Sequence, residues 1–348
     1  MDLPARTLND RAPNLDVLRT LAVSFVVVSH VLLDHSLDRI GHYHTQTLGT
    51  LGVMIFFVHT CLVLMRSLAR QDGEGTRRAV ALAFLANRVF RIYPLSIAVV
   101  LLLAALGWGP HLAPAALMSN VFLVQNLSGS PSITPVLWSL PFEVQMYLFL
   151  PALYWWTGAG AWRAWRRVLV LWGMCVLLVG ACRWYGAGAD LVKFFPCFLP
   201  GVLAYCLRTA PLRWPAGVLF GGVGAAAIIY PLLVGLGASA TVLAWGLCLG
   251  LGGVIPSCAD VTSAWVKAGA AIVARYSYGV YLVHVTVLDV AFHRLKGMPP
   301  GLDWLVFAGG VAALSYAAYH VIEKPGIGFG RKVVDRMAVL RRRAAQNI

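Results

Sequence analysis

Charged residues are scarce in this sequence. Asp, Glu, Lys and Arg make up 12% of its 348 residues, and the mean hydropathy is +0.74. A soluble domain carries about 25% charged residues, so this composition cannot cover a globule in water and excludes a soluble protein. The apolar residues form long continuous runs near the length of a membrane helix. Because these runs do not alternate with polar residues, they also exclude a membrane β-barrel.

Metal and nucleotide signatures are also missing. The seven cysteines form no CxxC pair and lie mostly inside apolar runs, where a thiol serves as a small packing side chain rather than as half of a disulfide. The His, Cys and acidic residues show no zinc-type spacing. Neither GxxxxGK[ST] nor GxGxxG occurs. We therefore expect no metal and no disulfide.

What the sequence does contain is a series of ten apolar segments, which predicts an all-α, polytopic transmembrane helical bundle. The predicted spans are 15–35, 47–65, 92–109, 138–157, 168–182, 194–207, 216–235, 240–256, 270–292 and 303–322. An eleventh apolar stretch, 113–127, is interrupted by Pro114 and Asn120. We expect it to lie at the outer face or to enter the membrane without crossing it.

Basic residues outnumber acidic ones by 28 to 14, giving a net charge of +14. They are clustered between the spans rather than in one patch, so they do not predict nucleic-acid binding. With both termini in the cytoplasm, 23 of the 28 lie on the cytoplasmic side, as the positive-inside rule requires. We expect a single transmembrane domain over residues 1–330 and a basic cytoplasmic tail over residues 331–348.

Polar side chains inside a membrane are costly and mark functional positions. Arg19 and His30 are eleven residues apart, so in a helix they share one face and are separated by about 16.5 Å. An arginine at the cytoplasmic rim and an imidazole near the bilayer centre suit an anionic cofactor whose reactive end reaches a general base. A snorkelling arginine and a hydrogen-bonded histidine are an equally good interpretation of these two residues alone.

Six short segments follow one another along the chain: 15–22 (LDVLRTLA) with His30 after it, 52–58 (GVMIFFV), 88–94 (RVFRIYP), 138–147 (WSLPFEVQMY), 277–284 (SYGVYLVH) and 322–325 (IEKP). They resemble, in order, the motifs LDxLRxxA…H, GVDxFFV, RxxRIYP, WSLxVExQFY, SYxxYLxH and IEKP of the integral-membrane acyltransferase-3 family.

The resemblance implies a ten-helix O-acyltransferase of the cytoplasmic (inner) membrane. Such a protein takes an acyl group from cytoplasmic acyl-CoA, with acetyl-CoA as the expected donor. It places the group on a hydroxyl of a carbohydrate or glycolipid acceptor at the outer face. His30 would remove the proton from that hydroxyl, by direct transfer or through a short-lived intermediate. The oligomeric state is not predicted.

Two departures fall in the second span. Met54 stands where the family commonly has Asp, and His59 begins the segment that replaces its ISGF. Because His59 is about ten residues into its span, it could lie at the depth of His30. A second catalytic imidazole, a contact to substrate and a packed histidine all remain open for it.

Other site candidates follow from the motifs. Arg88 and Arg91 are three residues apart at the mouth of the third span, where guanidinium groups can hold the phosphates of coenzyme A together with Arg19. Glu143 would pair with His30, bind the acceptor or form a structural ion pair. Tyr281 and His284 would line the acceptor cavity or the core.

The competing interpretation is a proton-coupled secondary transporter or flippase of an envelope intermediate. Intramembrane His, Arg and Glu side chains would serve proton coupling equally well. Transporters often show two similar halves with matching broken helices, and the sequence contains no such repeat.

Overall fold

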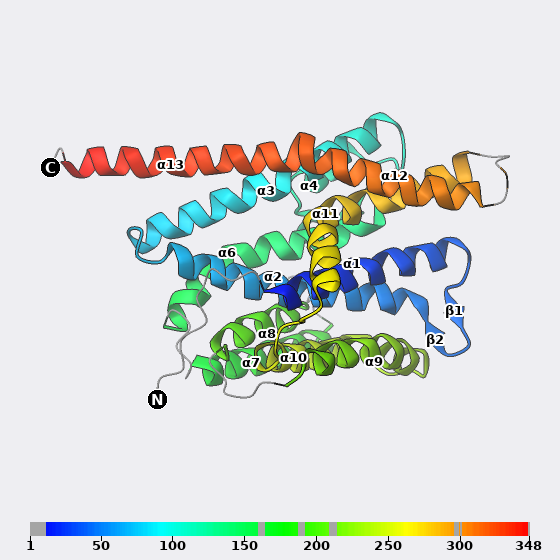
Figure 1. The fold of residues 1–348 in the computed structure, drawn as a ribbon, viewed down its shortest axis with the longest axis horizontal. Helices are drawn as coiled ribbons and strands as arrows, with labels where there is room; N and C mark the ends of the chain where they lie inside the picture. Colours follow the sequence, from blue (N-terminus) through cyan, green and yellow to red (C-terminus); the bar gives the residue numbers. More distant parts are fainter. Residues whose placement is uncertain are drawn as a thin grey trace. The chain divides into compact units, whose positions relative to one another are not determined.

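The computed structural model describes residues 12–158, 164–186, 192–208, 214–295, 299 and 301–346 (Figure 1). Within these residues, nine helices are long and apolar enough to cross a membrane. The strands of the described part are β1 (Arg39–Ile40) and β2 (Tyr43–His44), which pair antiparallel. The predicted all-α polytopic fold is therefore confirmed.

The chain divides into two compact units, and each unit is assembled from separate stretches of sequence. Unit 1 comprises Met1–Arg70 and Phe149–Ser277, and unit 2 comprises Gln71–Leu148 and Tyr278–Ile348. Helices α6 (Leu140–Trp156) and α11 (Ala264–Asp289) contribute residues to both units.

Unit 1 is built mainly from helices that run antiparallel to their neighbours in sequence. Its elements are α1 (Pro13–Asp34), the β1–β2 ribbon, α2 (Thr45–Gln71), α7 (Trp165–Trp184), α8 (Phe195–Cys206), α9 (Ala216–Gly235), α10 (Ala240–Val254) and the 3-10 turn η3 (Ile255–Ser257).

Glycines set the contact between α1 and α2. A methyl group on Gly52 would collide with the Ala22 carbonyl oxygen, and one on Gly49 would lie 2.8 Å from the Ser29 hydroxyl. Ser29 Oγ also donates a hydrogen bond to the carbonyl oxygen of Thr45 at 3.0 Å. These contacts fix the register of the two helices, with Ser29 beside Gly49 and Ala22 beside Gly52.

The β1–β2 ribbon is attached to α9 in the same unit. Tyr43 Oη donates to the carbonyl oxygen of Ala227 at 2.9 Å. Burial raises the pKa of Tyr43 above its usual value. A methyl group on Gly235 would collide with the His42 carbonyl oxygen. The ribbon therefore fixes the position of α9.

Helix α8 corresponds to the sixth predicted span but is shorter than a span. Its 12 residues rise about 18 Å, whereas the hydrocarbon core is about 30 Å thick. Residues Pro196–Cys206 are all buried. A methyl group on Gly201 would collide with Val58 of α2, and one on Gly252 of α10 would collide with Pro200. Protein thus encloses α8, which is close in length to the short predicted span 194–207.

Unit 2 contains the rest of the helices. Its elements are α3 (Arg77–Ala105), α4 (Pro114–Val121), α5 (Gln125–Ser128), the 3-10 turn η1 (Pro135–Ser139), the π-helical turns η4 (Val290–Arg294) and η5 (Tyr319–Glu323), α12 (Leu302–Ala318) and α13 (Lys324–Gln346).

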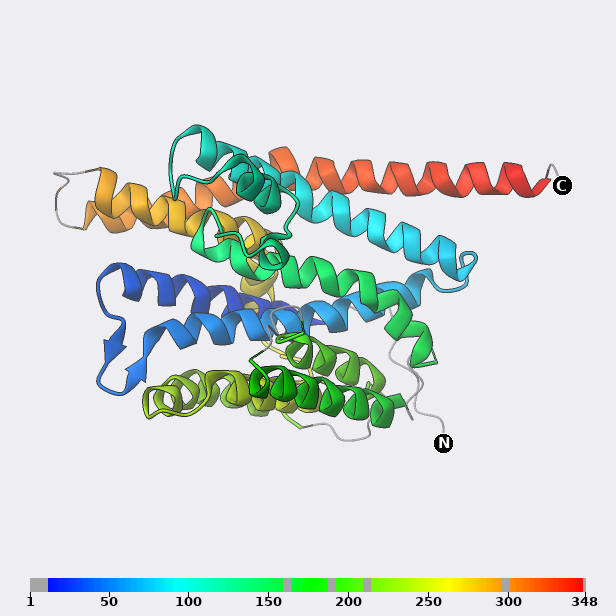
Figure 2. The same cartoon turned by 180° about the vertical axis from the view of Figure 1, so that it is seen from behind.

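Helix α3 begins 15 residues before the predicted start of its span at residue 92. Thr76 caps it, because Ala79 N donates to Thr76 Oγ1 at 3.3 Å. The helix runs beside α13 in both views (Figure 1 and Figure 2). Gly330 lets the two helices approach, since a methyl group there would lie 2.8 Å from Phe90. Packing against α13 therefore extends α3 beyond the apolar run that the sequence marked.

The stretch 113–127 forms only short helices, neither of which is long enough to cross a membrane, in line with the prediction. Helix α4 has 8 residues, or about 12 Å. Tyr93 Oη donates to the carbonyl oxygen of Phe122 at 3.0 Å, and Tyr93 is twelve residues, or about 18 Å, from the end of α3 at Ala105. The end of α4 therefore lies beside the middle of α3, so the segment turns back along α3 instead of continuing beyond its end.

Helices α12 and α13 form one continuous rod through the π-helical turn η5. Pro325 has no N–H to donate to the carbonyl four residues earlier, and a π-helical turn accommodates such a break. The predicted tail boundary at residue 331 falls inside α13. Arg6, Arg11, Arg163, Arg213 and Lys296, which the charge count includes, lie outside the described residues. The cytoplasmic placement of both termini stays a prediction.

Candidate functional site

Arg19 of α1 is anchored to α11 within unit 1. Its Nε donates to Ser277 Oγ at 2.5 Å, and Ser277 Oγ donates to the carbonyl oxygen of Ala274 at 2.9 Å. Ser277 is buried, whereas Arg19 is partly exposed. The Ser277 hydroxyl therefore orients the guanidinium group of Arg19, and part of the arginine side chain stays exposed.

His30 lies on the same helix, and its ring is oriented by the backbone. Nδ1 is 2.9 Å from the carbonyl oxygen of Val26. This contact requires a proton on Nδ1, so a neutral ring carries its lone pair on Nε2. The side chain is partly exposed. His30 is thus prepared to accept a proton at Nε2.

His30 lies near one end of α1. It is four residues, or about 6 Å, before the last residue of the helix, Asp34. Its depth in the membrane stays a prediction.

His59 does not lie at the depth of His30. The register of α1 and α2 places Ser29 beside Gly49, and His59 is ten residues, or about 15 Å, further along α2. Since the two helices are antiparallel, His59 is level with the stretch of α1 near Arg19. It is also buried. The sequence could not show this, because the register is set by the glycine contacts.

Ser29, which precedes His30 in the sequence, is a structural residue. It is buried, and its hydroxyl bonds the Thr45 carbonyl. That bond and the contact with Gly49 join α1 to α2.

In unit 2, Glu143 accepts a hydrogen bond from a tyrosine one helical turn further along α6. Tyr147 Oη donates to Glu143 Oε1. Arg88 and Arg91 of α3 lie near enough to Tyr147 for their charges to act on it. Both arginines are partly exposed, and Arg88 also lies over the ring of Phe84 at 6.0 Å.

A second tyrosine extends this group. Tyr278 Oη donates to the carbonyl oxygen of Ile92 at 2.8 Å, and Arg91, Glu143 and Glu323 all act on it electrostatically. We call Arg88, Arg91, Glu143, Tyr147, Tyr278 and Glu323 the arginine–carboxylate cluster. It combines guanidinium groups, which bind phosphate well, with carboxyl groups.

Tyr281 and His284 are both buried in unit 2. Tyr281 Oη donates to the carbonyl oxygen of Val136 at 2.7 Å and lies 2.7 Å from Ser139 Oγ. His284 Nδ1 is 2.9 Å from the carbonyl oxygen of Val280. The contacts of Tyr281 attach α11 to η1, whereas that of His284 lies within α11.

Sequence reasoning gave no role to Ser277, Tyr147 or Tyr278. All three lie inside the segments 138–147 and 277–284. The spacing of four residues between Glu143 and Tyr147 could have predicted their contact, because side chains four residues apart are neighbours on a helix. The contact between Ser277 and Arg19 spans 258 residues, so no local pattern reveals it.

No group of three His, Cys, Asp or Glu side chains in the described part of the chain is placed to hold a metal ion. All seven cysteines are free thiols.

Comparison with known proteins identifies a family. A family model described as an acyltransferase domain matches residues 13–320. No curated protein matches the chain. No solved structure matches it either.

Proposed function

The chain belongs to the acyltransferase-3 family, and from that premise we propose that this membrane acyltransferase uses cytoplasmic acyl-CoA, with acetyl-CoA as the expected donor. The acceptor is a hydroxyl of a carbohydrate or glycolipid at the outer face of the cytoplasmic membrane. The observation that carries the proposal is the geometry of His30.

His30 acts as the general base. The hydrogen bond from Nδ1 to Val26 holds the tautomer with its lone pair on Nε2. Nε2 takes the proton of the acceptor hydroxyl as that oxygen attacks the thioester carbonyl. The carbon–sulfur bond then breaks, and the thiolate of coenzyme A leaves and is protonated. The products are an ester and free coenzyme A.

Arginines hold the anionic donor. In unit 1, Ser277 orients Arg19 about 16.5 Å along α1 from His30. In unit 2, Arg88 and Arg91 offer guanidinium groups to the phosphates of coenzyme A. The carboxyl groups of the arginine–carboxylate cluster balance these charges when no donor is bound.

Glu143 has a positioning role in this proposal. Its bond from Tyr147 and its closeness to the arginines support a part in shaping the donor site. Tyr281 and His284 hold the part of α11 that lies in unit 2. His59 contributes to substrate binding only indirectly, because it is buried in α2.

The test is mass spectrometry of cell-envelope glycans and glycolipids from cells with and without the gene. We expect an acyl mass increment that disappears without the gene and returns with the wild-type copy. A copy carrying His30→Ala should not restore it.

His35 supplies the matched control. Its Nδ1 is 2.9 Å from the carbonyl oxygen of Val31, the same four-residue geometry as His30, but it caps the end of α1 and is exposed. His35→Ala should restore the increment when inserted at the wild-type level. An envelope whose acylation does not change when the gene is removed would refute the proposal.

A further inference from the structure

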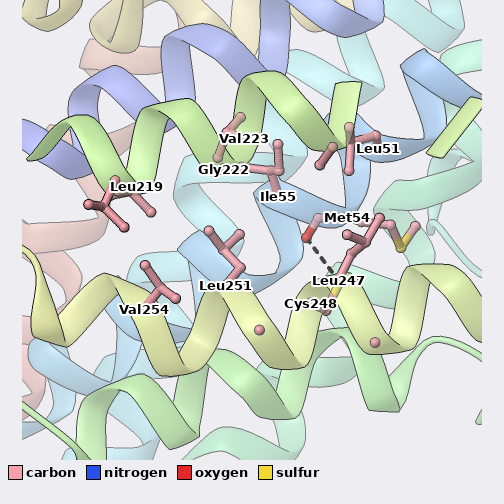
Figure 3. Close-up of a pocket in the computed structure, with 14 residues that line it drawn as sticks. Leu51, Met54, Ile55, Leu219, Gly222, Val223, Leu247, Cys248, Leu251 and Val254 are labelled. Atoms are coloured by element: carbon pink, nitrogen blue, oxygen red, sulfur yellow. Dashed lines mark hydrogen bonds between the residues drawn. The ribbon is translucent and has the colours of Figure 1, made fainter. Parts of the chain in front are cut away.

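An apolar groove of about 340 Å³ lies within unit 1, between α9 and α10 with α2 at its base (Figure 3). Met54 and Ile55 of α2, Leu219 and Val223 of α9, and Leu251 of α10 point toward it. No charged side chain lines it. Its lining excludes a sugar or a phosphate as its occupant, because their polar groups would find no partners there.

The groove has a buried floor and an open mouth. Met54, Ile55 and Leu219 are buried, whereas Gly222 of α9 and Gly250 of α10 are exposed. Both α9 and α10 belong to apolar segments long enough to cross a membrane. The groove therefore opens from the protein toward the hydrocarbon of the bilayer.

Three glycines of the lining leave space rather than permit helix contact. A methyl group on Gly222, Gly246 or Gly250 would meet no heavy atom within 4 Å. By contrast, one on Gly252 would collide with Pro200. Glycine inside a helix costs about 1 kcal/mol relative to alanine. Helix packing does not require glycine at these three positions, so each of them leaves open space in the wall of the groove.

We propose that this groove binds one hydrocarbon chain of a bilayer lipid. The lining of α9 from Val218 to Ala226 extends about 12 Å, the length of a chain segment of several methylene groups. The groove is large enough to hold such a segment.

Affinity in this groove comes from packing. A lipid chain is already in an apolar environment, so no hydrophobic gain accompanies its entry. The recessed floor and the two walls surround the chain with more contacting atoms than a flat helix face offers, and dispersion contacts add up. The inference does not depend on which acceptor the enzyme uses.

The experiment uses the full-length protein in vesicles that contain a phosphatidylethanolamine with a photoreactive diazirine on one acyl chain. After irradiation, labelled peptides are mapped by mass spectrometry. We expect adducts to concentrate on the groove face of α10, around Leu247 and Leu251, and to saturate as the probe fraction rises.

Glycine substitutions provide matched variants. Gly222→Leu and Gly250→Leu place side chains into the groove, and the space around both glycines lets the variants fold. Gly221→Leu and Gly253→Leu add the same side chain at neighbouring positions that also have nothing within 4 Å but do not line the groove. Labelling should fall about tenfold in the first pair, equivalent to about 1.4 kcal/mol, and stay unchanged in the second.

Three outcomes would overturn the proposal. Equal labelling in the groove-filled variants would do so, and so would adducts spread evenly over the exposed faces of α9 and α10, since both describe ordinary surrounding lipid. Preferential labelling of the groove by a photoreactive acyl-CoA would assign it to the chain of the donor instead.

Discussion

The two units differ in how their polar side chains are arranged. In unit 1, Arg19 and His30 stand apart on one helix, each oriented by a defined hydrogen bond. In unit 2, two arginines and two glutamates lie near enough to Tyr147 or Tyr278 for their charges to act on these tyrosines. A general base must be accessible to its substrate and must have a ring nitrogen that can accept a proton. A binding site for a ligand with several phosphates needs several positive charges close together. Under the proposed function, the general base lies in unit 1 and Arg88 and Arg91, which would bind the donor, lie in unit 2.

The largest expected effect tests the base in unit 1. His30→Ala should lower the transfer rate by about 100- to 10,000-fold, which is the usual contribution of a general base, and leave acyl-CoA affinity unchanged. His59→Ala should lose far less, because its ring is buried at another level of α2. Rate and donor affinity should be measured in membrane-inserted protein. Retention of more than about a tenth of the rate would remove His30 from this role.

The next effect concerns the arginines of unit 2. Arg88→Ala or Arg91→Ala should weaken acyl-CoA binding, because each removes a charge-assisted hydrogen bond of about 1.5–3 kcal/mol. That loss corresponds to roughly 10- to 150-fold in affinity. Titration of the purified variants with acyl-CoA measures it. Unchanged affinity in both variants would make these arginines topology anchors and would erase the functional contrast between the units.

A third prediction concerns the packing of α8 against α2 in unit 1. Gly201→Ala would push a methyl group into Val58, and overpacking of this kind costs about 1–3 kcal/mol. Gly221→Ala has open space and should be neutral or stabilising by up to about 1 kcal/mol. Thermal unfolding in detergent compares them. Equal stability of the two variants would contradict the close approach of α8 to α2.

The smallest effect concerns the anchor of Arg19. Ser277→Ala removes a hydrogen bond worth about 1 kcal/mol, so acyl-CoA affinity should fall roughly fivefold. Ser277→Thr keeps the hydroxyl and should restore the affinity. If both substitutions weaken binding equally, the effect comes from packing around residue 277 rather than from orientation of the guanidinium group.

Features that depend on spacing within one helix could be predicted from the sequence. The shared face of Arg19 and His30 follows from their eleven-residue separation, and the failure of 113–127 to cross follows from its polar interruptions. Features that depend on contacts between helices could not. The level of His59 is set by Gly49 against Ser29, and the length of α3 by its packing against α13. The partner of Arg19 comes from a distant helix.

The central claim is that this membrane acyltransferase draws its acyl group from acyl-CoA. The most direct measurement is release of coenzyme A from acetyl-CoA by the purified full-length protein in lipid nanodiscs, with an extract of envelope glycans and glycolipids as acceptor. The account predicts that coenzyme A appears in a one-to-one ratio with newly acetylated product and that His30→Ala suppresses both. Movement of an envelope intermediate across vesicle membranes without any release of coenzyme A would contradict it and favour a transporter.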